Sequence, residues 1–431
     1  MKNKILLTIC LVAISMTACE KKEILPGKRE AISGITVSEK TNISKELAAQ
    51  KITPKQAVTV SSIVDIAGNK QHLSANYKMP TNTKTLWKTS IGRGSINSDI
   101  IAFGGNIYAI DGMGYLNCVS QNDGKIVWKK QVAPQPDDAV FSGGITANNG
   151  VIYVGTNIGK VIAIDSKNKK EIWSKEIKSP TKGAPLYVDG KVIVTAIDNQ
   201  TFALDSSNGN IIWTKSSNKE DTTMAEAGSP AVIGNDLICA YSSGDIMSIE
   251  NKTGSDNWSD VLFSSNISES GFVISDIAAS PVVINNEYVL AATAESKTVL
   301  FDAISGIRVW EQDVGTITTP VINNDWVFML TGISSVTCLS LKDGSIKWES
   351  SARNLFADKR YDSYKWSGPI MINGDIVIFS ENGDAVTFDI STGKIKSQKI
   401  IVEKASIART PIIIDGKIFT ISNRAEIFAI G

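Results

Sequence analysis

Histidine is nearly absent from this chain, since His72 is the only one among its 431 residues. A serine or cysteine nucleophile activated by an imidazole would have to use His72, which lies in a segment expected to be flexible, and a zinc site built from histidines needs more than one of them. Carboxylates are scattered without a paired cluster, and no glycine-rich phosphate loop leads from a strand into a helix. The sequence therefore predicts no catalytic residues, no metal site and no cofactor, and it points away from an enzyme.

Apolar runs long enough to cross a bilayer as a helix are also lacking. The stretch from Ile5 to Ser15 follows Lys2 and Lys4 and has the length of a signal-peptide core. It ends at Met16-Thr17-Ala18-Cys19, which resembles the lipobox of bacterial lipoproteins. We therefore expect a signal peptide over residues 1–18 and lipidation of Cys19; an ordinary signal peptide is the alternative. For a lipoprotein of the kind that this segment resembles, Glu20 in place of Asp implies the periplasmic face of the outer membrane.

Net charge is missing too, because 44 basic residues balance 44 acidic ones, and nothing indicates nucleic-acid binding. Residues 20–84 carry an excess of lysine and few aromatic residues. A segment of this composition is typical of a solvated linker. We expect residues 19–84 to be a flexible tether, with a short helix around Ser44 to Lys51.

What the chain does contain is a repeat of about forty residues. It ends in D-x-x-x-G-x-x-x-W and recurs seven times between residues 100 and 400. A fixed period of this size predicts a solenoid, a propeller or an array, because one unit cannot bury its own apolar face. The copies end at Trp128, Trp173, Trp213, Trp258, Trp310, Trp348 and, in the seventh, Ser397. Lys169 replaces the glycine in one copy.

Each repeat holds four short β-branched runs separated by turn residues, as residues 229–258 illustrate. Helical periodicity is absent from them. Four strands joined by tight turns predict one antiparallel blade of a propeller. A proline opens the first strand of most blades, and the tryptophan should fill the wedge between blades, supported by the glycine turn that precedes it.

The ends of the repeat region predict how the ring closes. The last unit, from Thr410, supplies three strands and stops where the tryptophan strand should begin. A lone tryptophan strand lies at residues 85–91. Pairing the two predicts an all-β, eight-bladed propeller over residues 85–431, whose last blade is completed by the N-terminal strand and which leaves no free sheet edge at the closure.

Three cysteines remain inside the propeller region: Cys118, Cys239 and Cys338. Cys118 and Cys338 hold the same position in blades 1 and 6, which is too far apart for a disulfide. We expect them to be small buried apolar residues.

The repeat core, as in Ala163-Ile164-Asp165 to Trp173, resembles that of quinoprotein dehydrogenases, propellers that hold pyrroloquinoline quinone. It also resembles the BamB family of outer-membrane lipoproteins. The lipobox, short tether and bare eight-bladed ring are similar to BamB from residue 1 to 431, whereas the adjacent cysteines often found in the dehydrogenases are missing. The resemblance implies a non-enzymatic scaffold of the outer-membrane protein assembly (BAM) complex. The implied partners are a BamA-type insertase with POTRA domains and nascent β-barrel proteins.

In that family the loops that lead into blades 4 and 5 contact BamA. The turn Ile274-Ser275-Asp276 is similar to one of these loops, so the resemblance implies partner binding by Asp276 and the neighbouring Ser275. In the other loop, Met224 keeps an apolar residue, while the arginine usual in the family is missing. A turn-capping role is the alternative reading of Asp276.

A long connection at residues 349–368 is rich in aromatic and basic residues, as interface anchors are, although these side chains could instead pack over the junction of blades 6 and 7. Two other functions stay open at this point. One is a periplasmic quinoprotein dehydrogenase, and the other is a propeller that binds ligands or peptides as a sensor.

Overall fold

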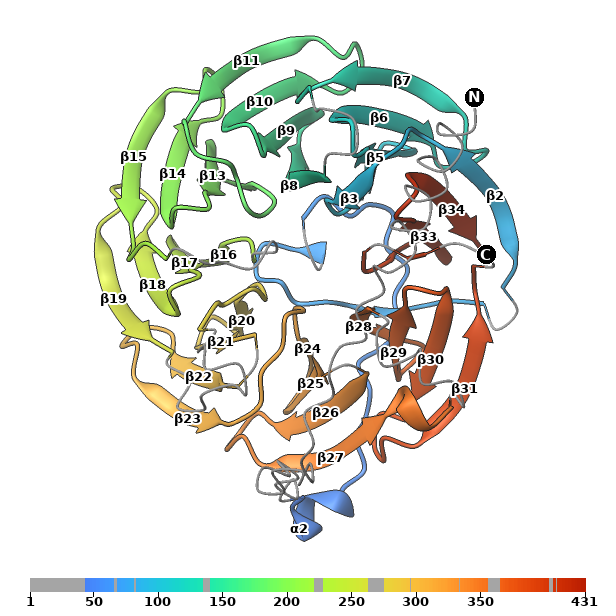
Figure 1. Ribbon diagram of the computed structural model, residues 1–431. Coiled ribbons are helices and arrows are strands. Elements are labelled where there is room, and N and C mark those ends of the chain that lie inside the picture. The colour runs from blue at the N-terminus through green and yellow to red at the C-terminus, as the bar shows by residue number, and fades with distance from the viewer. Residues whose placement is uncertain are drawn as a thin grey trace, which may run out of the picture. The chain divides into compact units, whose positions relative to one another are not determined.

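A computed structural model describes residues 43–65, 68–80, 83–134, 140–220, 228–262, 275–294, 296–332, 334–355, 365–402, 406–407 and 409–431. Residues 42–431 form one compact unit. Eight blades, each with four antiparallel strands, follow one another around a ring (Figure 1), which confirms the predicted propeller. None of the helices in these described ranges has the length and apolar character needed to span a membrane.

Blades 1 to 4 each run in chain order from the innermost to the outermost strand. Their strands are β4 to β7 (Ile101–Phe103, Asn106–Ile110, Tyr115–Ser120, Ile126–Gln131), β8 to β11 (Val140–Asn148, Val151–Thr156, Lys160–Asp165, Glu171–Glu176), β12 to β15 (Leu186–Val188, Lys191–Thr195, Gln200–Asp205, Ile211–Ser216) and β16 to β19 (Ala231–Ile233, Asp236–Ala240, Asp245–Glu250, Asp256–Val261). A short strand β3 (Ser95–Asn97) adds to β8 in parallel.

Blades 5 to 7 repeat this order, and blade 8 closes the ring. Their strands are β20 to β23 (Val282–Ile284, Tyr288–Ala292, Thr298–Asp302, Arg308–Gln312), β24 to β27 (Val321–Asn323, Trp326–Thr331, Ser335–Ser340, Ile346–Ser351), β28 to β31 (Trp366–Ile372, Asp375–Ser380, Asp384–Phe388, Ile395–Ile400) and β32 to β34 (Ile412–Ile414, Lys417–Ile421, Glu426–Ile430). The N-terminal strand β2 (Thr85–Ser90) pairs with β34 as the outermost strand of blade 8, as predicted.

The repeated tryptophans join neighbouring blades. In blade 3, Trp213 Nε1 donates to the carbonyl of Asn251 in blade 4 at 3.0 Å. A Cβ added to Gly254 of the same turn would lie 2.8 Å from the Trp213 ring. Only glycine fits there, so the glycine turn supports the tryptophan of the preceding blade, and the expectation that it supports the one in its own blade is wrong. The same pair of contacts recurs at Trp173, Trp258, Trp310 and Trp348, whereas Trp128 keeps the hydrogen bond but faces a turn with Lys169 in place of the glycine.

The short helix α2 (Lys45–Ala48) and the residues on either side of it pack on the propeller. Ser44 N donates to Ile346 O on the outer strand of blade 6 at 2.9 Å. The Lys347 ammonium, fully buried, donates to the carbonyls of Leu47 and Gln50. The expected short helix is therefore present, and it is held against β27.

Residues 50–65 and 68–80, which we call the strap, cross the centre of the ring in Figure 1. Each inner strand has one backbone edge that its own blade leaves unpaired, and the strap pairs with several of these edges. Its strand β1 (Asn76–Tyr77) runs parallel to β28, Ile63 bridges to Ala102 of blade 1, and Val283 N of blade 5 donates to Gln71 O. The expected flexible tether is thus wrong for residues 43–65 and 68–80, because their backbone and apolar side chains are tied to the ring.

Each blade has two faces, which matter for the site below. The two-residue turns between first and second strands emerge on the hairpin face. The strap lies there, since its contacts include Asn324, Asn373 and Asp415 in those turns. The connections from each outer strand to the next blade emerge on the opposite, loop face. Cys118, Cys239 and Cys338 are buried free thiols, as expected.

Candidate functional site

Asp276 and Ser275 lie on the loop face, where the chain leads into blade 5. The backbone of this segment is fixed on both sides: Ile277 N donates to Tyr241 O of blade 4, and Ala294 N donates to Asp276 O. Ser275 is half-buried, and a Cβ on Gly244 would lie 3.1 Å from its own Cβ. The turn is therefore seated against the loop of blade 4 that contains Gly244.

The Asp276 side chain is not exposed, as a surface contact would require. It is 3% accessible and pairs with the Lys182 ammonium, 4% accessible, at 2.9 Å. Burial lowers the pKa of Lys182, and the Asp276 carboxylate partly opposes this shift. The expectation of an exposed carboxylate at this position is wrong, because the side chain is buried against its counterion Lys182, whereas partner binding by this turn stays a prediction.

This ion pair belongs to a set of contacts that joins three blades. Lys182 comes from the segment that leads into blade 3, while Asp276 comes from the one that leads into blade 5. Between them, Ser229 of blade 4 donates its hydroxyl to Ala184 O of blade 3 at 2.7 Å, and its N–H to Ser280 Oγ of blade 5 at 3.0 Å. The loop face of blades 3 to 5 is therefore one connected block.

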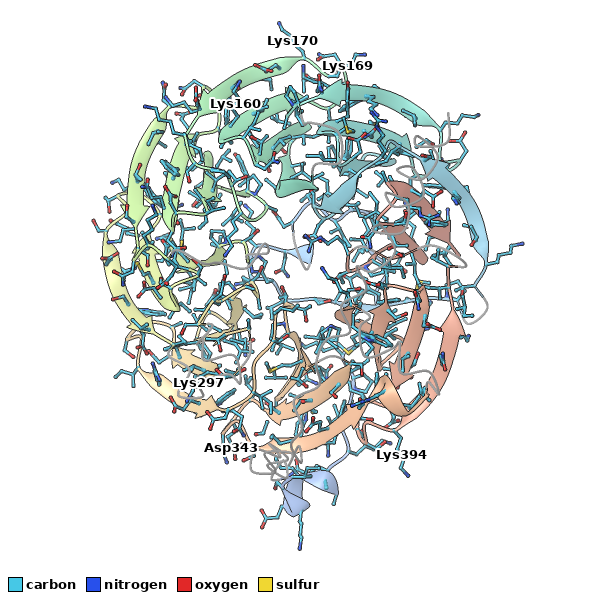
Figure 2. All side chains as sticks on the ribbon, viewed as in Figure 1. Lys160, Lys169, Lys170, Lys297, Asp343 and Lys394 are labelled. Atoms are coloured by element: carbon cyan, nitrogen blue, oxygen red, sulfur yellow. The ribbon has the colours of Figure 1, made fainter. Side chains whose placement is uncertain are left out.

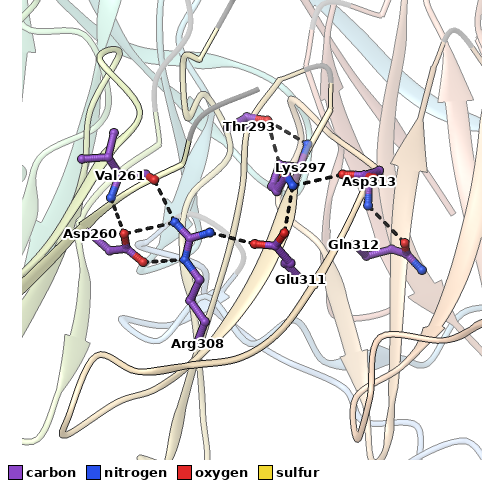
Figure 3. Close-up of polar contacts among 8 residues, drawn as sticks. All are labelled: Asp260, Val261, Thr293, Lys297, Arg308, Glu311, Gln312 and Asp313. Atoms are coloured by element: carbon purple, nitrogen blue, oxygen red, sulfur yellow. Dashed lines mark hydrogen bonds and ion pairs between the residues drawn. The ribbon is translucent and has the colours of Figure 1, made fainter. Parts of the chain in front are cut away.

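The outer rim next to this block carries an ionic network (Figure 3). Arg308 of β23 binds both Asp260 oxygens, at 2.6 and 3.0 Å, and Glu311 at 2.7 Å. Lys297 reaches Glu311 and Asp313, both at 3.1 Å. These groups are mostly half-exposed, so each pair should contribute at most about 1 kcal/mol. The network fixes the relative position of the outer strands of blades 4 and 5.

Most of the remaining residues predicted from the sequence either lie outside the described part of the chain or are buried in the fold. Cys19, Met224 and residues 356–364 of the connection at 349–368 lie outside the described residues. Trp366 is buried in β28, so it packs within the fold. Among the described residues, no group of three or more His, Cys, Asp and Glu side chains could hold a metal ion.

His72, expected in a flexible segment, is instead buried in the strap. Its Nδ1 lies 2.8 Å from Pro281 O of blade 5, so this nitrogen carries the proton and donates. Burial lowers the pKa of His72 to about 4. The neutral imidazole therefore ties the strap to blade 5 through this one hydrogen bond.

Comparisons with known proteins place the chain. Residues 112–350, more than half of the chain, match the family described as "Outer membrane protein assembly factor BamB". The protein of that name from Moranella endobia is 23% identical over 338 residues, which cover 75% of this chain and 82% of the relative. Among solved structures, BamB from Moraxella catarrhalis superposes with a TM-score of 0.69 at 17% identity, covering 81% of this chain and 99% of that one. A europium-containing methanol dehydrogenase has the same fold, with a TM-score of 0.66 at 13% identity over 86% and 98% of the chains. The chain therefore belongs to the family of the outer membrane protein assembly factor BamB.

Proposed function

We propose that this chain is a non-enzymatic scaffold of the outer-membrane protein assembly complex, which binds a BamA-type insertase and assists the folding and insertion of β-barrel proteins. Its membership of the BamB family supports this role, and the name of the matched family refers to the same process. The relatives match most of the chain and most of their own length, so the comparison concerns the whole propeller.

The loop face of blades 3 to 5 is the surface we propose for the insertase. One observation carries this choice: the strap occupies the hairpin face around the ring axis, whereas the loop face presents a block of connected segments at Ser275. Rigid surfaces bind with less loss of conformational entropy. Asp276, paired with Lys182 beneath this surface, would hold Ser275 in place and would not itself touch the partner.

Pull-down of the detergent-solubilised protein tests the proposal. We expect recovery of a barrel protein with periplasmic POTRA domains. Ser275→Arg should weaken this recovery at least tenfold, because a large cation would stand in the contact surface. Asn235→Arg, on the exposed hairpin turn of blade 4, is the matched control and should have no effect. Recovery of no such barrel, or equal loss with both variants, would count against the proposal.

We further propose that acylation of Cys19 holds the propeller at the periplasmic face of the outer membrane. The lipobox residues Met16 to Cys19 support this assignment. Cys19→Ala should abolish labelling by palmitate and release the protein from the outer-membrane fraction. Continued labelling of that variant would refute the anchor.

A periplasmic quinoprotein dehydrogenase is the second candidate, and the shared fold of the methanol dehydrogenase is the observation that favours it. This function predicts that the purified chain, supplied with pyrroloquinoline quinone and Ca²⁺, bleaches a redox dye when alcohols or sugars are added. The scaffold proposal predicts no bleaching, so the assay separates the two.

A further inference from the structure

Charge on the outer rim of the propeller is divided between two halves of the ring. The last turn and outer strand of each blade form a twelve-residue unit, and residues 84–90 take its place in blade 8. In blades 1 to 7 the units are residues 120–131, 165–176, 205–216, 250–261, 302–313, 340–351 and 389–400. In blades 7, 8, 1 and 2 these units hold 12 lysines and 5 acidic residues, so 12 − 5 gives +7. In blades 3 to 6 they hold 5 basic and 9 acidic residues, so 5 − 9 gives −4.

Ion pairs neutralise only part of the basic half, which we call the basic arc. Three of its lysines pair with carboxylates outside the counted units: Lys88 with Glu426, Lys129 with Asp111, and Lys396 with Asp375. Over the described residues, subtracting these pairs leaves 7 − 3, or +4, and setting aside Lys399, which has an interaction of its own, still leaves +3. The lysines of the arc are Lys84, Lys88, Lys125, Lys129, Lys130, Lys167, Lys169, Lys170, Lys175, Lys394, Lys396 and Lys399.

The densest part of the arc is the last turn of blade 2, where Lys167, Lys169 and Lys170 are all exposed. Figure 2 shows Lys169 and Lys170 at the outer edge of the ring. Lys169 has a φ of +56°, at the position where the other six repeats have glycine with φ between 70° and 78°. A left-handed conformation is unfavourable for a residue with a Cβ. A strained lysine in an exposed turn is a feature that stability does not explain.

Apolar side chains lie among these lysines. On the outer strand β7, Val127 is 57% exposed and Ile126 is 45% exposed, and Ile172 on β11 is 46% exposed. Basic and apolar groups side by side suit the headgroup region of a bilayer with anionic lipids, which attracts lysine and accommodates aliphatic side chains. An acidic protein surface would favour the lysines but not the aliphatic groups.

We propose that the basic arc, centred on blades 1 and 2, is a docking surface for anionic phospholipid headgroups. Lipid binding by this surface would add to the membrane affinity of the acyl anchor expected at Cys19, because two weak contacts made by the same chain reinforce each other. The first described residues, which pack on blade 6, lie next to blade 7 at one end of the arc. The proposal does not depend on the insertase or on the loop face.

The sequence itself offers a variant that should fold. The blade 2 turn reads Asp165-Ser-Lys-Asn-Lys-Lys170, whereas the equivalent turn of blade 3 reads Asp205-Ser-Ser-Asn-Gly-Asn210. Changing Lys167→Ser, Lys169→Gly and Lys170→Asn copies the blade 3 turn into blade 2. This graft removes three positive charges and the strained conformation, so its melting temperature should equal or exceed that of the wild type. The control, with Lys219→Ser, Lys252→Ser and Lys342→Ser, removes three exposed lysines from blades 3, 4 and 6.

Flotation with vesicles tests the proposal. Residues 20–431, which include every described residue, would be mixed with vesicles of phosphatidylcholine alone or with about 30% phosphatidylglycerol, a composition in which a nearby lysine strengthens binding about fivefold. We expect binding only with phosphatidylglycerol, loss of binding in high salt, at least a tenfold loss with the graft, and less than a threefold change with the control. Binding that is absent, that does not need phosphatidylglycerol, or that the graft and control weaken equally would overturn the proposal.

Discussion

At the scale of single residues, the pairing of Lys182 with Asp276 decides how the loop face can be tested. Two charges taken out of water gain little net stability as a pair, yet removal of one leaves the other buried without its counterion. A substitution at Asp276 therefore changes folding and binding together. Ser275, half-buried and without a charge, reports on binding with less disturbance of the fold.

A double-mutant cycle measures this pairing. Asp276→Asn or Lys182→Met alone should destabilise the protein by about 3 kcal/mol. The cost of Asp276→Asn has an upper limit near 5 kcal/mol at pH 7, because the unpaired lysine can lose its proton. The double variant should cost at least about 2 kcal/mol less than the sum of the two. Urea unfolding of the three variants checks this, and additive losses would contradict a direct ion pair.

The sequence could predict which turn contains Asp276 but not that its side chain is buried. Its place before blade 5 follows from the repeat and from the following proline. Its burial depends on Lys182, which lies 94 residues earlier, and a contact over that separation leaves no local pattern. The structural role of the repeated tryptophans and glycines was easier to predict, because they form the same contact in most blades and so recur at a fixed period.

At the scale of elements, the strap shows where periodicity fails as a guide. Strands of the blades show either alternating polar and apolar residues or continuous apolar runs, because whole faces of each sheet are buried. The strap instead contributes single buried side chains such as Ile52, Ile63 and Tyr77 between polar residues, and it pairs with each blade through one or two backbone groups. Such a segment has the composition of a linker and yet is ordered by the edges that it covers.

Acid should loosen the strap through His72. Its pKa is about 4 in the folded chain and about 6.5 when unfolded. The unfolded state therefore binds one more proton between these values, and stability falls by about 1.4 kcal/mol for each pH unit from 6.5 down to 4, or about 3 kcal/mol in all. His72→Asn keeps a donor for Pro281 O and does not titrate in this range.

Unfolding of wild type and His72→Asn between pH 7.5 and 4 measures the effect. Other groups titrate equally in both proteins and cancel in the difference. Wild type should be the more stable at pH 7.5, and its advantage should shrink by about 3 kcal/mol as the pH falls to 4. Curves that stay parallel would show that the imidazole does not sense the pH while the protein is folded.

At the scale of the whole molecule, ring closure explains the one repeat that lacks its tryptophan. Each repeat tryptophan donates to a carbonyl in the last turn of the next blade, and all but Trp128 pack on the glycine of that turn. Blade 8 has no such turn, because its outermost strand β2 comes from the other end of the chain. Ser397 in blade 7 therefore faces a position where a tryptophan would find neither partner.

Closure also predicts where the ring opens first. Trp213 is 8% accessible and lies between blades that the chain joins directly, so Trp213→Ala should cost about 3–5 kcal/mol. Trp87 on β2 is half-buried and donates to Gln121 O at 3.3 Å. Trp87→Ala should therefore lower the free energy of unfolding by less than Trp213→Ala does. Blade 8, however, is held to β2 by hydrogen bonds and packing alone, so Trp87→Ala should selectively lower the opening free energy of β34. Native-state hydrogen exchange should then show faster exchange at Ile427 and Phe428 than in β18 of blade 4, relative to wild type. A uniform increase over all blades would mean that the ring opens as one unit and that β2 is not its weakest joint.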